Sequence, residues 1–233
     1  MLSTAVQRPH IAGTRRAQVC RAAADVSAPV KPAVPVEPIL EVLRSAARQP
    51  GSVPPPEVLK SLVALEQAKL QPSEEWQQWL TDPATRWRLI YTAPAKDVMA
   101  ASKGSKGGGG RYFPIPACQK FVLDEMSFEN GVFLGPLASL TFKGPYLMKG
   151  RRLMFDVNSL NLGLGPWRLS IPLKASTPFD QLPPKEQADL PFFLYAYLDS
   201  ELLVGRGRSG GLALWRRADP EWSAKAGVLQ VYK

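Results

Sequence analysis

Residues 86–92, RWRLIYT, mark the point where the hydrophobic period of the chain changes from that of a helix to that of a strand. Trp87, Leu89 and Tyr91 occupy alternate positions, so a regular strand would place them on one face. Further strand-like runs, separated by Gly, Pro or Asn-Gly and not by helical patterns, follow at 119–123, 128–134, 137–143, 146–148, 153–157, 168–173, 192–198, 202–205 and 212–217. This spacing predicts an antiparallel β-barrel or sandwich.

One turn in this series has two interpretations. Asn130-Gly131 is the strongest short-range signal for a β-hairpin. Alternatively, Asp124-Glu125-Met126 forms the turn, and Asn130-Gly131 lies within the following strand as a bulge.

Helical periodicity precedes Arg86. Two short helices are expected at 38–48 and 56–70, and a single-turn segment at 73–82. The unit 37–82 is too small for a catalytic domain. We therefore expect a helical apron that packs beside, or plugs, a β domain at 84–233.

The N-terminal segment has the composition of an organellar targeting sequence. The first acidic residue is Asp25, and four arginines precede it: Arg8, Arg15, Arg16 and Arg21. Without these arginines the formal net charge falls from +9 to +5. Residues 1–22 lack the apolar core of a secretory signal, so their composition predicts an organellar transit peptide. The rest of the chain favours a plastid transit peptide, and mitochondrial import is the alternative. Residues 23–36 are Pro-rich and are expected to form a linker.

The rarest residues exclude several kinds of chemistry. His10 is the single histidine and lies in the expected transit peptide, which leaves the mature chain no imidazole for acid–base catalysis or metal binding. Removal of Cys20 with that peptide leaves Cys118 alone, so no intramolecular disulfide and no Cys-rich zinc site is possible. We therefore expect no metal, no cofactor and no conventional enzyme. Cys118 is expected to be a small buried residue or an inert thiol.

Two glycine-rich stretches match functional motifs only formally. Gly207-Arg-Ser-Gly-Gly211 fits the hydrolase nucleophile elbow, but that elbow needs a strand-to-helix turn and a downstream histidine. Residues 104–110, flanked by Lys103, lack the order of a phosphate-binding loop. A tight turn and a surface loop are the expected structures. A basic, Gly-rich stretch such as 104–110, followed by Arg111, can contact RNA. The net charge of the chain without residues 1–22 is modest, however, and the sequence contains no RNA-module signature, so we do not expect nucleic acid as a partner.

Asp199 and Glu201 are two residues apart, so a regular strand would place both carboxylates on one face, as an acid–base pair requires. A polar bend between two strands is the favoured interpretation. The run at 191–198 before Asp199 has no polar face, which indicates a strand covered on both sides.

Three stretches resemble one family, the plastid-lipid-associated proteins, also called plastid fibrillins. Residues 86–92 are similar to the opening strand of that domain, and GVFLGPL with LTFKG, at 131–137 and 140–144, resembles its middle. Residues 197–215, YLDSELLVGRGRSGGLALW, resemble its closing hairpin. The resemblance covers roughly 84–217. The glycine loop at 104–110 and the closing Leu-Trp-Arg-Arg depart from the common pattern.

The resemblance implies a lipocalin-like antiparallel β-barrel in the chloroplast, in the stroma, at the thylakoid surface or on plastoglobules. It also implies non-enzymatic binding, storage or membrane-surface organisation of lipids, carotenoids or prenylquinones. The alternatives are a structural coat protein without a saturable internal site and a plastid RNA-associated factor. Candidate ligand contacts are aromatic residues of the strands and the matching aspartate: Trp87, Tyr91, Phe133, Phe142, Phe155, Phe193, Tyr195, Tyr197 and Asp199.

Trp87 also predicts a closed barrel floor. The first and last strands of an even-stranded antiparallel barrel are neighbours, which places Trp87 near Arg216 or Arg217. A guanidinium stacked on this indole is what the resemblance implies. Arg216 shares a face with Leu212 and Leu214, and these apolar companions favour Arg216 as the inward residue.

Overall fold

The computed structural model describes residues 35–105, 108–175, 177 and 179–231. These residues fall within the compact unit Val34–Lys233. The expected transit peptide at 1–22, and the 23–36 linker up to residue 34, lie outside the described residues.

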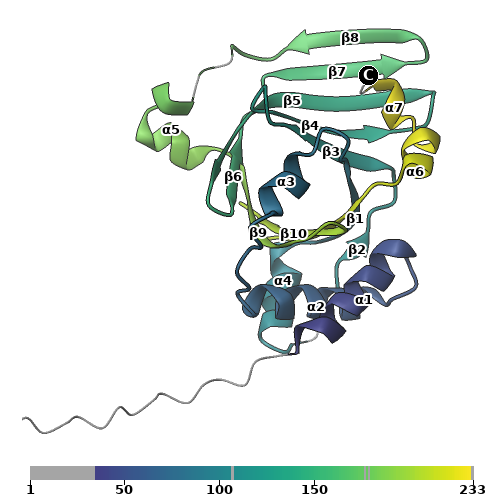
Figure 1. The fold of residues 1–233 in the computed structure, drawn as a ribbon, viewed down its shortest axis with the longest axis vertical. Coiled ribbons are helices and arrows are strands. Elements are labelled where there is room, and N and C mark those ends of the chain that lie inside the picture. Colours follow the sequence, from purple (N-terminus) through teal and green to yellow (C-terminus); the bar gives the residue numbers. More distant parts are fainter. Residues whose placement is uncertain (1–34, 106–107, 176, 178, 232–233) are drawn as a thin grey trace, which may run out of the picture. The chain divides into compact units, whose positions relative to one another are not determined.

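Eight antiparallel strands close into a barrel (Figure 1). Around the ring their order is β1, β11, β10, β9, β6, β5, β4 and β3, and β3 pairs again with β1. Their bounds are Trp87–Ala93 (β1), Ala117–Val122 (β3), Ser127–Phe133 (β4), Ala138–Lys149 (β5), Arg152–Phe155 (β6), Phe192–Leu198 (β9), Leu202–Gly207 (β10) and Leu212–Arg217 (β11). The prediction of a mainly β, lipocalin-like barrel with short N-terminal helices is therefore confirmed.

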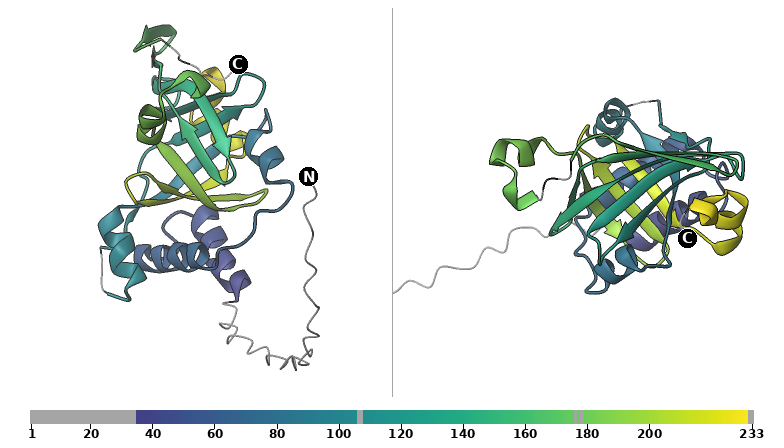
Figure 2. Two further views of the ribbon diagram at one scale, coloured as in Figure 1. Left: turned by 90° about the vertical axis from the view of Figure 1, so that its left-hand side faces the viewer. Right: turned by 90° about the horizontal axis from the view of Figure 1, so that it is seen from above.

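Strand β5 has different neighbours along its length. Its part from Tyr146 to Lys149 pairs with β6, whereas its part from Ala138 to Lys143 pairs with β7 (Ser159–Leu164). Strand β7 in turn pairs with β8 (Trp167–Pro172). The hairpin of β7 and β8 thus extends the barrel wall beyond the ring (Figure 1, Figure 2). We call it the β7–β8 flap. The short β2 (Arg111–Tyr112) pairs with β1.

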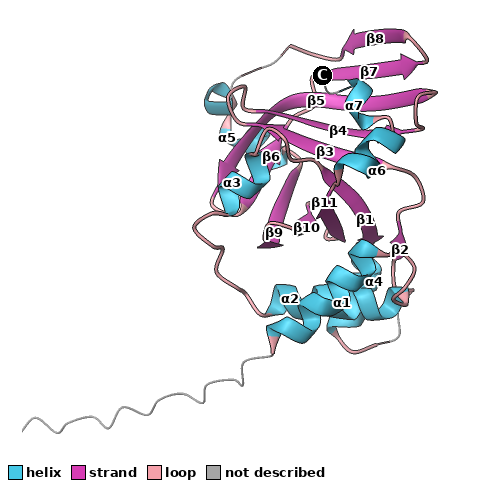
Figure 3. Ribbon diagram, turned by 45° about the vertical axis from the view of Figure 1, so that its right-hand side comes forward, coloured by secondary structure: helices cyan, strands magenta, loops and turns pink. Residues whose placement is uncertain are grey.

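Helices cover the barrel at three places. Helices α1 (Val36–Arg48), α2 (Pro55–Gln67) and α4 (Ala95–Ser102) lie together on one side of it (Figure 3). Helix α3 (Trp76–Thr81) lies across one end, and α6 (Pro220–Lys225) and α7 (Val228–Val231) pack on the outside near β3 and β4. A 3-10 turn (Phe179–Gln181) and α5 (Pro184–Asp189) connect β8 to β9. Among the described helices, none has the length and apolar content to span a bilayer.

A bulge in β1 corrects the expected face of one candidate residue. The register with β11 shifts between Leu89 and Tyr91, so Ile90 is inserted. Ile90 and Tyr91 both pack into the cluster beneath α1 and α2, whereas Trp87 faces the barrel interior. The prediction that Tyr91 shares a face with Trp87 was wrong, because one extra residue reverses the alternation. A second shift, at Ala196 in β9, separates Tyr195 from Tyr197 in the same way.

The contested turn lies at 123–126. The Met126 amide donates to the Leu123 carbonyl at 3.0 Å, and the pairing of β3 with β4 begins immediately after it. Gly131 is an ordinary strand position with no register shift, so a bulge there was a wrong prediction. A Cβ at Gly131 would come within 2.5 Å of the Thr141 methyl group, which is why a glycine stands there.

Sequence reasoning missed two strands, the short β2 and β7, and divided another. The runs predicted at 137–143 and 146–148 form the single strand β5, and β7 was not predicted. Strand β7 carries a regular alternation of Leu160, Leu162 and Leu164, and this period-2 pattern is a signal that identifies it.

Candidate functional site

Aromatic side chains fill the barrel interior. Of the candidate residues, Trp87, Phe155, Phe193 and Tyr195 lie there. The ring centroid of Phe193 is 5.4 Å from that of Phe155, 5.4 Å from that of Trp215 and 6.4 Å from that of Tyr195. These four of the nine candidate residues thus form part of a packed core.

Trp87 contributes to a floor at the α3 end of the barrel. Its side chain is fully buried, and its indole N–H donates to the Leu80 carbonyl of α3 at 3.4 Å. The residue opposite it on β11 is Arg217, whose guanidinium binds the Asp82 carboxylate at 2.7 Å. The floor is therefore built from Trp87 together with α3 and the residues that follow it.

The choice of Arg216 as the inward arginine was wrong. Arg216 lies opposite Arg88 and points to the outer face, with its Nε atom 3.7 Å from a Glu201 carboxylate oxygen. Leu212 and Leu214 do share its face, but that face is buried by α1 and α2 and not by the barrel interior. Apolar neighbours on the same strand face indicate that this face is buried, but they do not indicate whether the barrel interior or a helix buries it.

Tyr91 lies beneath the helices. Its hydroxyl group contacts the carbonyls of Pro55, at 3.0 Å, and Gly109. Burial raises its pKa above the ordinary value. In the glycine loop, the backbone amides of Gly108 and Gly110 donate to the Asp97 carboxylate, so its described residues are anchored.

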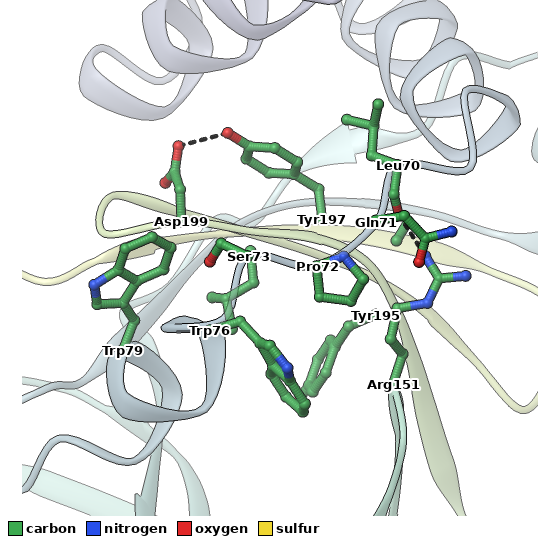
Figure 4. A pocket seen from close by; sticks show the side chains of 12 residues that line it. Leu70, Gln71, Pro72, Ser73, Trp76, Trp79, Arg151, Tyr195, Tyr197 and Asp199 are labelled. Carbon is green, nitrogen blue, oxygen red and sulfur yellow. Dashed lines mark hydrogen bonds between the residues drawn. The ribbon is translucent and has the colours of Figure 1, made fainter.

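Asp199 forms the turn between β9 and β10. One carboxylate oxygen accepts the backbone amides of Glu201 and Leu202 at 2.7 and 2.6 Å, and the other accepts the Tyr197 hydroxyl at 2.8 Å (Figure 4). Arg44 of α1 also binds this second oxygen, at 3.4 Å. The polar bend is the interpretation that these contacts support, because structural partners occupy the carboxylate.

The Gly207–Gly211 segment connects β10 directly to β11. Ser209 therefore stands on a strand-to-strand turn and lacks the strand-to-helix context of a nucleophile elbow.

The two remaining candidates lie elsewhere. Phe133 is buried with Cys118 beneath α6 and α7. Phe142 is 38% exposed and lies opposite Leu160 of the flap. The nine candidate residues are thus distributed over four places and do not form one ligand site.

The flap and the adjoining part of β5 carry several solvent-exposed apolar side chains. Cross-strand register places nine apolar side chains on one face: Ala138, Leu140, Phe142, Leu160, Leu162, Leu164, Trp167, Leu169 and Ile171. We call this set the apolar face. Trp167 is 78% and Leu164 69% exposed. The opposite face is polar, with Ser159, Asn161, Arg168 and Ser170.

The apolar face continues the inner surface of the barrel. From Trp87, the cross-strand row passes through Gln119 and Asn130 to Phe142. At its far end, two turns meet, because the Gly165 amide donates to the Leu137 carbonyl at 2.8 Å. Leu137 is 71% exposed, so this edge also presents apolar groups to solvent.

Comparison with known proteins adds little to the geometry. No family model matches the chain, and no curated protein matches it at a significant level. Among solved structures, the NMR structure of a protein from Burkholderia xenovorans is similar, with 14% identity and a TM-score of 0.32 over 64% of this chain and 90% of that one. A likeness of this size supports no statement about function.

Proposed function

We propose that this chain is a non-enzymatic protein that binds lipid surfaces and organises apolar plastid molecules there. The apolar face carries the proposal, because five of its nine side chains are exposed to solvent on a folded sheet. Contiguous exposed apolar surface of this kind marks a site of contact with a membrane or a partner.

The charge of the same region favours an anionic lipid surface as the occupant. Residues 130–175 contain one acidic residue, Asp156, which pairs with Lys174 at 2.8 Å. The same stretch carries six basic residues: Lys143, Lys149, Arg151, Arg152, Arg168 and Lys174. The net charge of this stretch is therefore +5, six basic residues less one acidic residue, which attracts anionic lipid head groups. Trp167 suits the boundary between head groups and acyl chains.

We also propose membership of the plastid-lipid-associated protein family and a chloroplast location. The support is the three similar stretches and the acid-free, Arg-rich segment at 1–22. A fluorescent fusion of residues 1–35 is expected to enter plastids. Import of that fusion into mitochondria would contradict the proposed chloroplast location.

Vesicle binding tests the lipid proposal. The full chain is expected to bind vesicles that contain phosphatidylglycerol, and to bind them less well as salt rises. The double variant Leu164→Ser/Trp167→Ser is expected to lose at least ~10-fold in partitioning, because each buried apolar side chain contributes roughly 1.5–3 kcal/mol. The Ser209→Ala variant is expected to bind as the unaltered chain does.

Met99→Ser is the matched control, since Met99 is 58% exposed on α4, away from the apolar face. It should leave vesicle binding unchanged. Absent vesicle binding, or binding that the double variant keeps, overturns the proposal. Self-association that the double variant abolishes, without vesicle binding, would assign the face to a second copy of the chain.

A further inference from the structure

Two arginines lie directly opposite each other on the outer wall of the barrel. Arg88 of β1 and Arg216 of β11 are cross-strand partners, so their side chains leave the sheet on the same face. The Cβ atoms of such partners are ~4.5–5.5 Å apart. Like charges at these positions destabilise a sheet, so the pair weakens the barrel wall unless an anion lies between the two charges.

The arginine pair lies between two helices that cover this wall. On one side, Arg48 at the end of α1 binds Glu201, and the Arg216 Nε atom is 3.7 Å from the same carboxylate. On the other side, the guanidinium carbon of Arg88 lies 4.9 Å from the ring centroid of Trp222 in α6. Both arginines of the pair are partly exposed, so a solute can reach them from solvent.

The neighbouring carboxylates do not neutralise the pair. Both oxygens of Glu201 are bound by Arg48 at 2.9 Å, and the Asp219 carboxylate accepts a backbone amide of α6 at 2.6 Å. Among the described residues, none accepts a hydrogen bond from Arg88 or forms an ion pair with it. Burial and the charge of Arg216 lower the pKa of Arg88, against the smaller opposite effect of Asp219. A half-buried guanidinium without a carboxylate partner is costly.

We propose that Arg88 and Arg216 form a binding site for a phosphate group, with Trp222 as one wall. A guanidinium group presents parallel N–H donors that match two oxygens of a phosphate. The Arg216 Nε atom is buried beside Glu201, so we assign the contact to the terminal amino groups of this side chain. Stacking on Trp222 holds the Arg88 guanidinium in one orientation.

Two guanidinium groups favour a phosphate over a carboxylate. A phosphate dianion has two charges and enough oxygens for both arginines, whereas a carboxylate has one charge and two oxygens, which a single arginine satisfies. The site contains no residue of the apolar face. It therefore goes beyond the proposed lipid surface and does not depend on it.

Calorimetric titration of the full chain with inorganic phosphate tests the site. At constant ionic strength we expect saturable binding of phosphate, and at least ~10-fold weaker binding of acetate. Arg88→Gln and Arg216→Gln should each weaken phosphate binding by at least ~10-fold, because each removes charge-assisted hydrogen bonds. Arg88→Lys keeps the charge but loses the two-point contact, so it should also weaken binding.

Arg168→Gln is the matched control. The Arg168 guanidinium donates to the carbonyls of Gly165 and Trp167 in the flap, outside the site, so phosphate affinity should not change. Thermal denaturation without phosphate separates binding from a structural role. Removal of one of two repelling charges should leave the Tm of Arg88→Gln equal to or above that of the unaltered chain. A lower Tm with unchanged phosphate affinity would assign the pair to the fold and overturn the site.

Vesicles that contain phosphatidylglycerol identify the source of the phosphate group. If Arg88→Gln/Arg216→Gln loses phosphate binding and keeps vesicle binding, the ligand is a soluble phosphate. Loss of both assigns the site to the phosphate of a lipid head group. Leu164→Ser/Trp167→Ser should keep phosphate affinity, which separates failure of this site from failure of the lipid proposal. Absent saturable phosphate binding, or full affinity in both glutamine variants, overturns the proposal.

Discussion

Two leucine-rich parts of the same sheet differ in what covers them. On the outer faces of β10 and β11, Leu202, Leu212 and Leu214 are almost completely buried by α1 and α2. On β7 and β8, leucines with the same alternation lie open to solvent. Alternation therefore decides which residues share a face, whereas a helix held against that face decides whether it is buried.

Ion pairs accompany the covered part. Arg206 of β10 binds both carboxylate oxygens of Glu66 in α2, at 2.6 and 2.5 Å. Arg48 of α1 binds both oxygens of Glu201 in the same way, at 2.9 Å. Such two-point contacts fix direction as well as distance, so they set the orientation of the helices on the sheet.

The sharpest test of the comparison truncates one leucine in each part. Leu62→Ala in α2 removes a fully buried side chain and is expected to lower the free energy of unfolding by ~2–5 kcal/mol. Leu164→Ala in the flap should change it by less than ~0.5 kcal/mol. Urea denaturation measures both. Equal losses would mean that the flap packs as tightly as the apron.

Breaking a helix-to-barrel ion pair should have a smaller effect. The hydrogen bonds with Glu66 raise the pKa of Arg206. Glu66→Gln removes this carboxylate and leaves the guanidinium without an ionic partner from Glu66. We expect a loss of ~1–2 kcal/mol, since charge-assisted hydrogen bonds at a half-buried site are partly screened. Glu125→Gln is the control: Glu125 pairs with Lys143 at 3.1 Å in solvent, and no measurable change is expected. A comparable loss for both variants would remove the distinction between the two parts.

The polar side of β4 and β5 should respond to pH. Burial raises the pKa of Glu129, against the hydrogen bond that the Thr141 hydroxyl donates to it at 2.6 Å. A raised pKa in the folded state favours the protonated form, so the carboxyl stabilises the fold below its ordinary pKa, and this contribution is lost as pH rises. Glu129→Gln should therefore gain stability near pH ~7 relative to the unaltered chain. The gain should vanish near pH ~4, and a gain that persists there would contradict the assignment.

The smallest effect concerns Cys118, whose pKa burial raises to about 12. In a Cys20→Ser background, iodoacetamide near pH ~8 should leave the folded chain unlabelled and label it fully in denaturant. Trp222 packs against the cluster that contains Cys118, so Trp222→Ala should loosen α6 and accelerate labelling of the thiol. Mass spectrometry measures the labelled fraction. Rapid labelling of the unaltered fold would show that α6 and α7 do not cover β3.

The sequence allowed the barrel to be predicted, but not the faces of all its strands. Short alternating runs with turn residues between them specify antiparallel pairing, and the interior position of Trp87 agrees with that pattern. Tyr91 was misplaced because the inserted Ile90 has no signal in composition. Arg216 was misplaced because a strand covered on both sides has two apolar faces, and hydropathy does not distinguish them.

The candidate sites depended on longer-range information. A groove between α3 and the β3–β4 turn joins segments some forty residues apart in the chain, so it is recognisable only once the fold is known. The apolar face could have been predicted from the sequence, because Leu160, Leu162 and Leu164 occupy alternate positions, but the strand that they form was not predicted.

Strand β8 gives this closed barrel an open edge. It pairs with β7 alone among the described strands, so one side of its backbone offers free amide and carbonyl groups to any extended chain. Its sequence resists such growth: the strand has six residues, begins just after Pro166, carries Arg168 and ends at Pro172. Proline cannot donate to a further ladder, and the charge of Arg168 opposes stacking of identical copies. The flap is thus protected from fibril-like addition along its edge, while its broad side stays free to meet other molecules.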